Sequence, residues 1–162
     1  MASSEKNLSV VEGSDIPDGS TMRIAIVVSE WNEAITGALF DGAVKTLLEN
    51  KVKKDNIIIS KVPGSFELTL ATQFLCEDKS IEAVIALGCV IQGETKHFDF
   101  ICDAVAHGIT NVGLKYNKPV IFGVLTTNTL LQAQERAGGK HGNKGDEAAV
   151  TALKMVALKR SM

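Results

Sequence analysis

The sequence predicts an α/β fold, a three-layer α/β/α sandwich built around a four-stranded parallel sheet. Two observations predict it. Four short runs rich in β-branched residues alternate with segments whose apolar residues recur at helical spacing, and such alternation indicates βαβ units with right-handed crossovers. Each run is also continuously apolar, which is typical of strands covered on both faces. The predicted strands are residues 23–28, 56–62, 83–87 and 119–125.

The segments between and after these strands have helical periodicity. We expect helices over residues 34–50, 66–76, 98–112, 128–137 and 146–159. The second helix places Phe66, Leu70 and Phe74 at positions i, i+4 and i+8, a stripe that an amphipathic helix turns toward the core. In the last helix the same spacing directs Leu153 and Val156 inward.

Length and composition suit one compact domain. The chain has 162 residues, of which 45% are hydrophobic and 22% charged, and this is ordinary globular usage. We expect a single domain over residues 22–162, preceded by a flexible tail over residues 1–21. The tail has neither the apolar stretch of a signal peptide nor the Arg content of a transit sequence, so we expect a cytoplasmic protein.

Charge and cysteine content exclude several classes of function. A net charge of −2 without a basic run argues against a nucleic-acid partner, because phosphate binding needs clustered Lys and Arg. No apolar run approaches the ~18 residues of a membrane span. Cys76, Cys89 and Cys102 lie far apart in apolar segments, which argues against a disulfide framework or a zinc site and favours buried, reduced thiols.

The predicted topology places function at one edge of the sheet. In open α/β sheets, ligands bind in the crevice beyond the carboxyl ends of the strands. The connections that follow the four predicted strands are rich in residue types that bind small molecules, and they are residues 29–32, 63–67, 88–97 and 126–128. These four connections form the candidate site.

The connection 88–97 carries the clearest local signal. Gly93 permits close approach of a ligand to the backbone, Thr95 can cap the next helix, and the N–H groups of a helix start favour an anion. Glu94 and Thr95 stand where a nucleotide P-loop has Lys and Ser or Thr, so this is not a P-loop. A plain strand-to-helix turn explains these residues equally well. His97, one turn into that helix, is the side chain type best able to move protons near pH 7, although a lone histidine is more often an ordinary surface residue.

Three further side chains have both a structural and a functional interpretation. Trp31, the only tryptophan, is either a surface anchor or a platform for a planar ring. Glu67 is either an exposed acid in the first turn of a helix or an acceptor for the hydroxyls of a polyol. Arg136 begins the glycine-rich segment 136–145, where its charge suits a helix C-terminus and its planar guanidinium suits a phosphate. Spacing alone does not choose between these interpretations.

Taken together, the segments 29–32, 63–67, 88–97 and 136–145 resemble the 6,7-dimethyl-8-ribityllumazine synthase family. The similarity begins near Met22 and continues in order to the C-terminus, and four separated motifs in register are far more specific than any one of them. We expect the sheet to have a flavodoxin-like strand order, 2-1-3-4. The resemblance implies a transferase of riboflavin biosynthesis that condenses 5-amino-6-(D-ribitylamino)uracil with 3,4-dihydroxy-2-butanone 4-phosphate, without a metal or organic cofactor. The implied products are 6,7-dimethyl-8-ribityllumazine, phosphate and water.

The resemblance also implies roles for individual residues. The pyrimidine ring and ribityl chain are expected to contact Trp31, Asn32, Ser65, Phe66, Glu67, Val90, Ile91 and Phe122. The phosphate is expected to contact Gly93, Glu94, Thr95, Arg136 and Lys144. His97 is the expected catalytic residue for proton transfer, and Arg136 and Phe122 are implied to come from a neighbouring subunit. Gln92 stands where many members carry Lys or Arg, which weakens the local positive charge.

Sites shared between neighbours imply an oligomer, and the unit of the family is a pentameric ring. Some members remain pentameric or decameric, whereas others close twelve pentamers into an icosahedral shell. Residues 138–145 form a short connection similar to that of shell-forming members, while strictly pentameric members tend to have an insertion there. We therefore expect a homo-oligomeric capsid of 60 subunits, with riboflavin synthase as a candidate cargo.

Two other classes of function share some of these features. A flavodoxin-like module that binds a flavin or nucleotide would have the same sheet and anion-binding loop, but it gives no reason for His97 and Arg136 to occur together. A structural shell protein would share the assembly, but its connections would not need polar, aromatic and glycine residues. The sequence therefore favours the enzyme.

Overall fold

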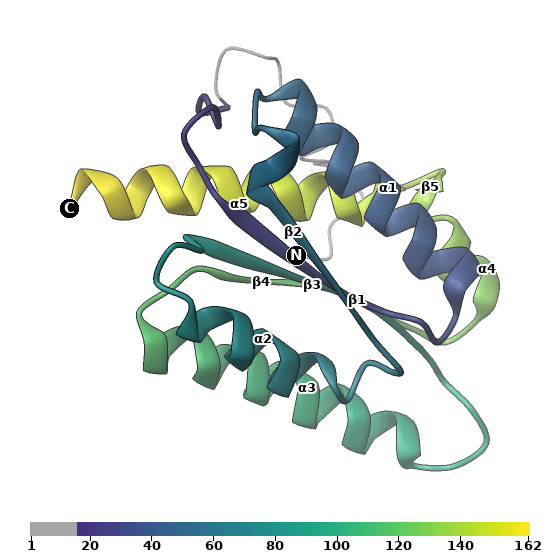
Figure 1. Ribbon diagram of the computed structural model, residues 1–162. Coiled ribbons are helices and arrows are strands. Elements are labelled where there is room, and N and C mark those ends of the chain that lie inside the picture. The colour runs from purple at the N-terminus through teal and green to yellow at the C-terminus, as the bar shows by residue number, and fades with distance from the viewer. Residues whose placement is uncertain (1–15) are drawn as a thin grey trace.

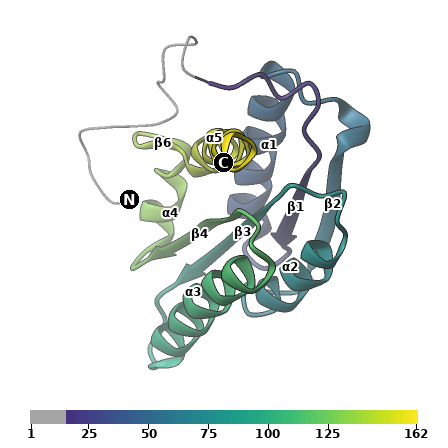
Figure 2. The same ribbon diagram turned by 90° about the vertical axis from the view of Figure 1, so that its left-hand side faces the viewer.

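The computed structural model describes residues 16–162 and has three layers (Figure 1). The central sheet consists of parallel strands β1 (Ile24–Ser29), β2 (Ile57–Val62), β3 (Ala83–Ile91) and β4 (Val120–Thr127). One face is covered by α1 (Glu33–Glu49) and α5 (Lys144–Ser161), and the other by α2 (Leu68–Glu77) and α3 (His97–Tyr116) (Figures 1 and 2). The strand order is β2-β1-β3-β4, which confirms the predicted sandwich and the predicted order.

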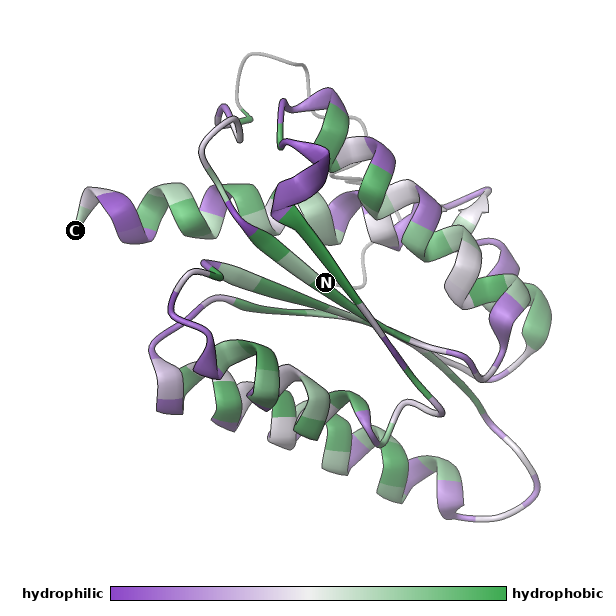
Figure 3. Ribbon diagram, viewed as in Figure 1, coloured by the Kyte–Doolittle hydropathy of each residue, from purple (hydrophilic) through white to green (hydrophobic). Residues whose placement is uncertain are grey.

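Two central strands form the middle of the core. Every residue of β1 is buried, and its side chains alternate between two apolar clusters. Ile24 and Ile26 pack in the cluster under α1 and α5, whereas Ala25 and Val27 pack in the cluster under α2 and α3. Apolar residues accordingly follow the strands of the sheet (Figure 3). The prediction of coverage on both faces is wrong for the edge strands, since β2 and β4 both have exposed positions.

The strand β3 is longer than predicted. It continues through the residues 88–91 that the sequence analysis assigned to a loop, because Val90 and Ile91 pair with Thr126 and Thr127 of β4. The connection to α3 is consequently reduced to residues 92–96. This extension places the side chains of Val90 and Ile91 on a rigid strand at the carboxyl edge of the sheet.

The predicted inward face of α2 is wrong. Phe66, Leu70 and Phe74 are 56%, 54% and 60% exposed, whereas the buried residues of the helix are Leu68, Thr72 and Cys76. Phe66 also precedes the helix, which begins at Leu68. The smaller Thr72 and Cys76 side chains let the helix lie close to the sheet. We call Phe66, Leu70 and Phe74 the α2 stripe, an exposed apolar surface.

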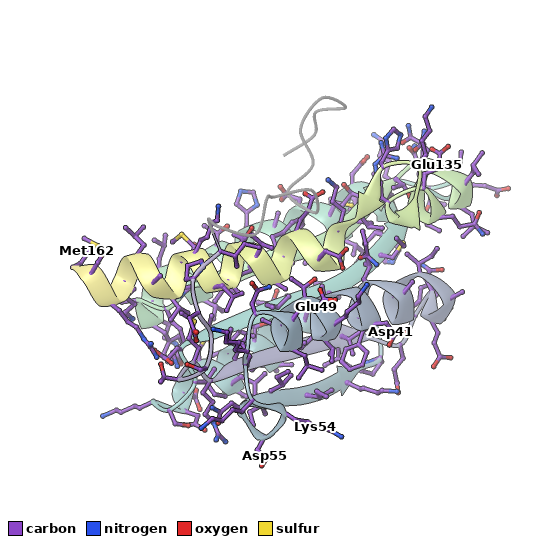
Figure 4. All side chains as sticks on the ribbon, turned by 90° about the horizontal axis from the view of Figure 1, so that it is seen from above. Asp41, Glu49, Lys54, Asp55, Glu135 and Met162 are labelled. Carbon is purple, nitrogen blue, oxygen red and sulfur yellow. The ribbon has the colours of Figure 1, made fainter. Side chains whose placement is uncertain are left out.

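The helices on the other face approach each other closely. Seen from above, α1 and α5 lie side by side over the sheet, with Met162 at the far end of α5 (Figure 4). Gly145 allows this approach, because a Cβ atom there would lie 1.9 Å from the carbonyl oxygen of Leu39. Leu153 and Val156 are buried, as predicted, although α5 begins two residues earlier than expected, at Lys144.

The region before α5 differs from the expected helix and glycine-rich connection. The helix predicted over residues 128–137 is the short α4 (Leu130–Gln134). After it, β5 (Ala137–Gly139) and β6 (Gly142–Asn143) form an antiparallel hairpin. Gly138 and Gly142 have φ values of 106° and 75°, which glycine adopts at little cost and other residues rarely adopt. A single 3₁₀ turn, η2 (Lys54–Asn56), precedes β2.

The N-terminal tail predicted over residues 1–21 is described only from residue 16 onward, and residues 1–15 lie outside the described part. Residues 16–21 contact the domain. The Gly19 N–H donates to the carbonyl of Asn50 at 2.8 Å, and the Arg160 guanidinium donates to the Thr21 hydroxyl at 2.9 Å and to its carbonyl at 3.2 Å. Packing against the domain therefore begins before Met22.

The three cysteines carry free thiols, as predicted. Cys76 and Cys89 are buried and Cys102 is half-buried. Burial raises the pKa of the Cys89 thiol to about 11, so this thiol is protonated at neutral pH and is a poor nucleophile. Within residues 16–162, no helix is long and apolar enough to cross a membrane, and no group of three or more His, Cys, Asp or Glu side chains is placed to hold a metal ion.

Candidate active site

The strand-to-helix connections meet at the carboxyl edge of the sheet, on the right of Figure 1. A cleft of about 740 Å³, which we call the first cleft, opens there between the connections that follow β1, β2 and β3. Ten residues that the sequence analysis selected line it: Trp31, Asn32, Ser65, Phe66, Glu67, Val90, Ile91, Gly93, Thr95 and His97. Gly64, Phe98 and Ile101 complete the lining.

The connection after β1 presents Trp31 at the mouth of the first cleft. The indole is 72% exposed, but its backbone is held firmly. The Trp31 N–H donates to the carbonyl of Pro63 at 3.0 Å, and the Glu30 N–H donates to the carbonyl of Val62 at 2.8 Å. These bonds extend the pairing of β1 with β2 into the two connections, so the two connections lie side by side at the cleft.

The connection after β2 supplies the floor and a second wall. Ser65 is buried, and its hydroxyl has no hydrogen-bond partner among the residues that the structure describes. Gly88 of β3 makes room for it, since a Cβ atom on Gly88 would lie 2.7 Å from Ser65 Oγ. Phe66 and Glu67 are exposed and line the cleft. The floor therefore offers an unpaired hydroxyl beside an exposed carboxylate.

The connection after β3 leads directly into α3. The Gln92 N–H donates to the carbonyl of Thr127 at 2.9 Å, which holds the start of the connection against β4. Gly93 and Thr95 are exposed, and Thr95 Oγ1 accepts only a long bond, 3.4 Å, from the His97 N–H. His97 is the first residue of α3, and the prediction that it lies one turn into the helix is wrong. In that first turn the Asp99 N–H donates to the Lys96 carbonyl at 3.0 Å, and the Phe100 N–H donates to the same carbonyl at 3.4 Å.

Four predicted contact residues do not line the first cleft. Phe122, Arg136 and Lys144 line a second cleft of about 1140 Å³, formed mainly by α3, β4 and α5. Thr126 and Thr127, from the fourth predicted connection, line this second cleft as well. Glu94 is exposed and lines neither cleft. Within one chain, the predicted site is therefore divided between two clefts.

The second cleft contains a paired cation and a tethered one. Lys144 Nζ donates to Glu147 Oε1 at 2.7 Å, and Glu147 is only 8% exposed. Arg136 Nη1 donates to the carbonyl of Gln132 at 3.0 Å, which uses one of its five donors and leaves the guanidinium half-buried at the cleft. Both cations are thus held in defined positions beside an open space.

Comparison with known proteins identifies the family. A sequence model of 6,7-dimethyl-8-ribityllumazine synthase matches residues 21–160. The chain belongs to the 6,7-dimethyl-8-ribityllumazine synthase family. It is 62% identical to the 6,7-dimethyl-8-ribityllumazine synthase of Cytophaga hutchinsonii over 157 residues, which cover 97% of this chain and 98% of the relative. It is 57% identical to that of Porphyromonas gingivalis over 160 residues, 99% of each chain, and 54% identical to that of Parabacteroides distasonis over 156 residues, 96% of this chain and 98% of the relative.

Membership of the lumazine synthase family confirms the predicted resemblance, and with it the prediction of a transferase of riboflavin biosynthesis. Sequence reasoning missed two features of the site. Glu147 was not selected, although its spacing of three residues from Lys144 is typical of an ion pair on one helix face. Phe98 and Ile101 were not selected either, although they are half-buried and line the first cleft.

Proposed function

We propose that this protein condenses 5-amino-6-(D-ribitylamino)uracil with 3,4-dihydroxy-2-butanone 4-phosphate, and forms 6,7-dimethyl-8-ribityllumazine, phosphate and water. The observation that carries the proposal is the composition of the first cleft. One cleft is lined by an aromatic ring, a carboxylate beside an unpaired hydroxyl, an exposed connection that contains glycine, and a histidine. Each of these matches one part of the two substrates.

The heterocycle of the first substrate suits the mouth of the cleft. Trp31 offers a flat and largely exposed indole face, and aromatic faces stack well on planar rings. Val90 and Ile91 form an apolar wall on β3. The ribityl hydroxyls suit the floor, where Glu67 accepts hydrogen bonds and the buried Ser65 hydroxyl lacks a described partner. A polyol can satisfy both groups at once.

The phosphate of the second substrate suits the connection before α3. Gly93 and Thr95 are exposed there, and the start of this 20-residue helix presents the positive end of its dipole. His97, as the first residue of α3, lies beside that position. A phosphate bound at the connection would bring its carbon chain next to the imidazole.

The chemistry then requires positioning and proton transfer. The amine of the ribitylaminouracil is itself the nucleophile, so the protein supplies no covalent one. Holding two reactants in line contributes up to about 7–11 kcal/mol to lowering the barrier. A single general acid–base such as His97 contributes about 10²–10⁴-fold, during imine formation and loss of phosphate.

We further propose that Phe122, Arg136 and Lys144 reach this site from a neighbouring copy of the chain. The support is that these residues lie in a separate cleft within one chain, and that the chain has two different exposed apolar surfaces. The α2 stripe is one of them, and the second cleft, which includes Met155 and Leu158, is the other. Contact between two unlike surfaces is head-to-tail, and it closes into a ring when the rotation allows.

A pentameric ring, a capsid of 60 subunits and riboflavin synthase as cargo extend the same proposal. The segment between α4 and α5 is a compact hairpin without an insertion, tied by the His141 N–H to the carbonyl of Glu135 at 2.8 Å. Light scattering tests the assembly, since a mass near that of five 17.3-kDa chains would refute the capsid. A cytoplasmic location belongs to the proposal as well, because free thiols suit a reducing compartment.

The activity is tested by mixing both substrates and following lumazine formation by absorbance against an uncatalysed blank. We expect acceleration by the wild-type protein and a loss of about 10²–10⁴-fold in His97→Ala. His107→Ala is the matched control, because His107 lies on the same helix, outside the first cleft, and hydrogen-bonds to the carbonyl of Asp103. No acceleration above the blank would refute the proposed function, and full activity in His97→Ala would refute the role of His97.

A further inference from the structure

Asn32 has a backbone conformation that is uncommon for a residue with a side chain. Its φ of 62° and ψ of 43° lie in the left-handed region, which Asn tolerates better than most residues. The residue ends the connection after β1 and begins α1, since its carbonyl accepts from the Ile35 N–H at 2.8 Å. The chain therefore turns sharply right after Trp31, whose indole lies at the mouth of the first cleft.

The side chain of Asn32 attaches this turn to β3. Its Nδ2 donates to the carbonyl of Cys89 at 3.0 Å. The pairing of β1 with β3 ends at Val28 opposite Leu87, so Cys89 lies beyond the last pair. The Asn32 amide thus supplies a donor to a carbonyl that β1 no longer reaches.

The two residues that follow Cys89 make this bond relevant to the cleft. Val90 and Ile91, the next residues of β3, line the first cleft. On the opposite side, the Trp31 N–H donates to the carbonyl of Pro63. The residue pair Trp31–Asn32 is therefore fixed from both sides, to the connection after β2 by a backbone bond and to β3 by a side-chain bond.

We propose that Asn32 is a positioning residue that fixes the backbone of Trp31, and so holds its indole at the mouth of the first cleft, before a substrate binds. A platform that is rigid in the free protein does not have to be ordered on binding, and this increases affinity. The role is distinct from the ribityl contact that the family resemblance implies for Asn32, because it uses the amide N–H that donates to the Cys89 carbonyl in the free protein. The inference rests on the proposed function only for the identity of the planar ligand.

Two substitutions separate the left-handed backbone conformation of Asn32 from its side-chain hydrogen bond to Cys89. Asn32→Gly keeps the left-handed conformation without cost but removes the bond to Cys89. Asn32→Asp keeps the size of the side chain and tolerance of this conformation, but places a carboxylate oxygen against the carbonyl. Lys51→Gly is the matched control, because Lys51 has a φ of 70° and lies outside both clefts.

The test uses Trp31 as its own probe, since it is the only tryptophan in the chain. Time-resolved fluorescence anisotropy of the ligand-free protein reports the local motion of the indole, and steady-state kinetics report KM for each substrate. We expect both Asn32 variants to lower the residual anisotropy and to raise KM for the ribitylaminouracil about three- to tenfold. KM for the phosphate substrate should change less than about twofold, and Lys51→Gly should match the wild type in every readout.

The two readouts distinguish the possible failures. Wild-type anisotropy in both Asn32 variants overturns the inference, and a raised KM together with that anisotropy would show that Asn32 contacts the substrate directly. If the wild-type protein forms no lumazine, the proposed function fails, whereas the anisotropy of the ligand-free variants still decides the positioning role. Thermal denaturation and light scattering of each variant verify that fold and assembly are intact. If only one of the two Asn32 variants folds, that variant alone decides the test.

Discussion

Gly88 lies at the point where β3 passes beneath the floor of the first cleft. A Cβ atom on Gly88 would lie 2.7 Å from Ser65 Oγ, 2.8 Å from Leu68 Cδ1 and 3.4 Å from Val124 Cγ1. The two shortest distances are far below van der Waals contact, so Ser65 and Leu68 must both move. Leu68 is fully buried in the first turn of α2, and it has no free space into which to move.

We therefore expect Gly88→Ala to destabilise the protein and to alter the cleft floor. Overpacking a well-packed core costs about 1–3 kcal/mol, which corresponds to a lower Tm by about 2–12 °C for a chain of this size. Because Ser65 lines the first cleft, its displacement should raise KM for the ribitylaminouracil as well. Thermal denaturation and steady-state kinetics measure the two effects.

Gly37→Ala is the matched control for this substitution. Among residues 16–162, and apart from the adjacent backbone of α1, no atom lies within 4 Å of a Cβ on Gly37; the residue lies inside α1, where alanine is favoured over glycine by about 1 kcal/mol. We expect this variant to be slightly more stable than the wild type, with unchanged kinetics. A Gly88→Ala protein with wild-type Tm and wild-type KM would refute the steric argument.

Three further substitutions test other parts of the structure. Arg136→Ala should raise KM for the phosphate substrate about tenfold or more while changing KM for the other substrate little, and an equal rise in both would contradict a phosphate role. Burial raises the pKa of Asp146 above its usual value, so the ionised carboxylate destabilises the folded protein at neutral pH. Asp146→Asn should therefore raise Tm at pH 7. That gain in Tm should disappear below about pH 4, where Asp146 is protonated in both the folded and the unfolded protein. A Tm gain that is independent of pH would contradict this cause. Phe74→Asp should dissociate the proposed assembly, which light scattering measures, and an unchanged mass would show that the α2 stripe is not an interface.

The sequence predicts best what depends on burial. Continuous apolar runs identified β1 and β3, because strands covered on both faces need apolar side chains at every position. The rule that ligands bind beyond the carboxyl ends of parallel strands then selected three connections that do line one cleft. These inferences needed only local composition and topology.

The face of α2 could not be predicted in the same way. Helical periodicity identifies an apolar stripe, but it does not say what covers that stripe. The α2 helix has two rows that contain large apolar residues, and the sheet takes the row of Leu68, Thr72 and Cys76. The row that contains Leu70 and Phe74 remains exposed in the single chain. The end of β3 could not be predicted from its local sequence either, because its last residues pair with Thr126 and Thr127 of β4.

The division of the predicted site between two clefts follows from the same exposed row. Phe66 belongs both to the α2 stripe and to the lining of the first cleft, so a neighbour that covers the stripe must also lie against that cleft. The second cleft, with Phe122 and Arg136, is the surface of the chain that such a neighbour would bring. Phe74 lines neither cleft, yet Phe74→Asp should lower activity together with mass. Dissociation without loss of activity would mean that one chain is sufficient for catalysis, and the residues of the second cleft would then need a different role.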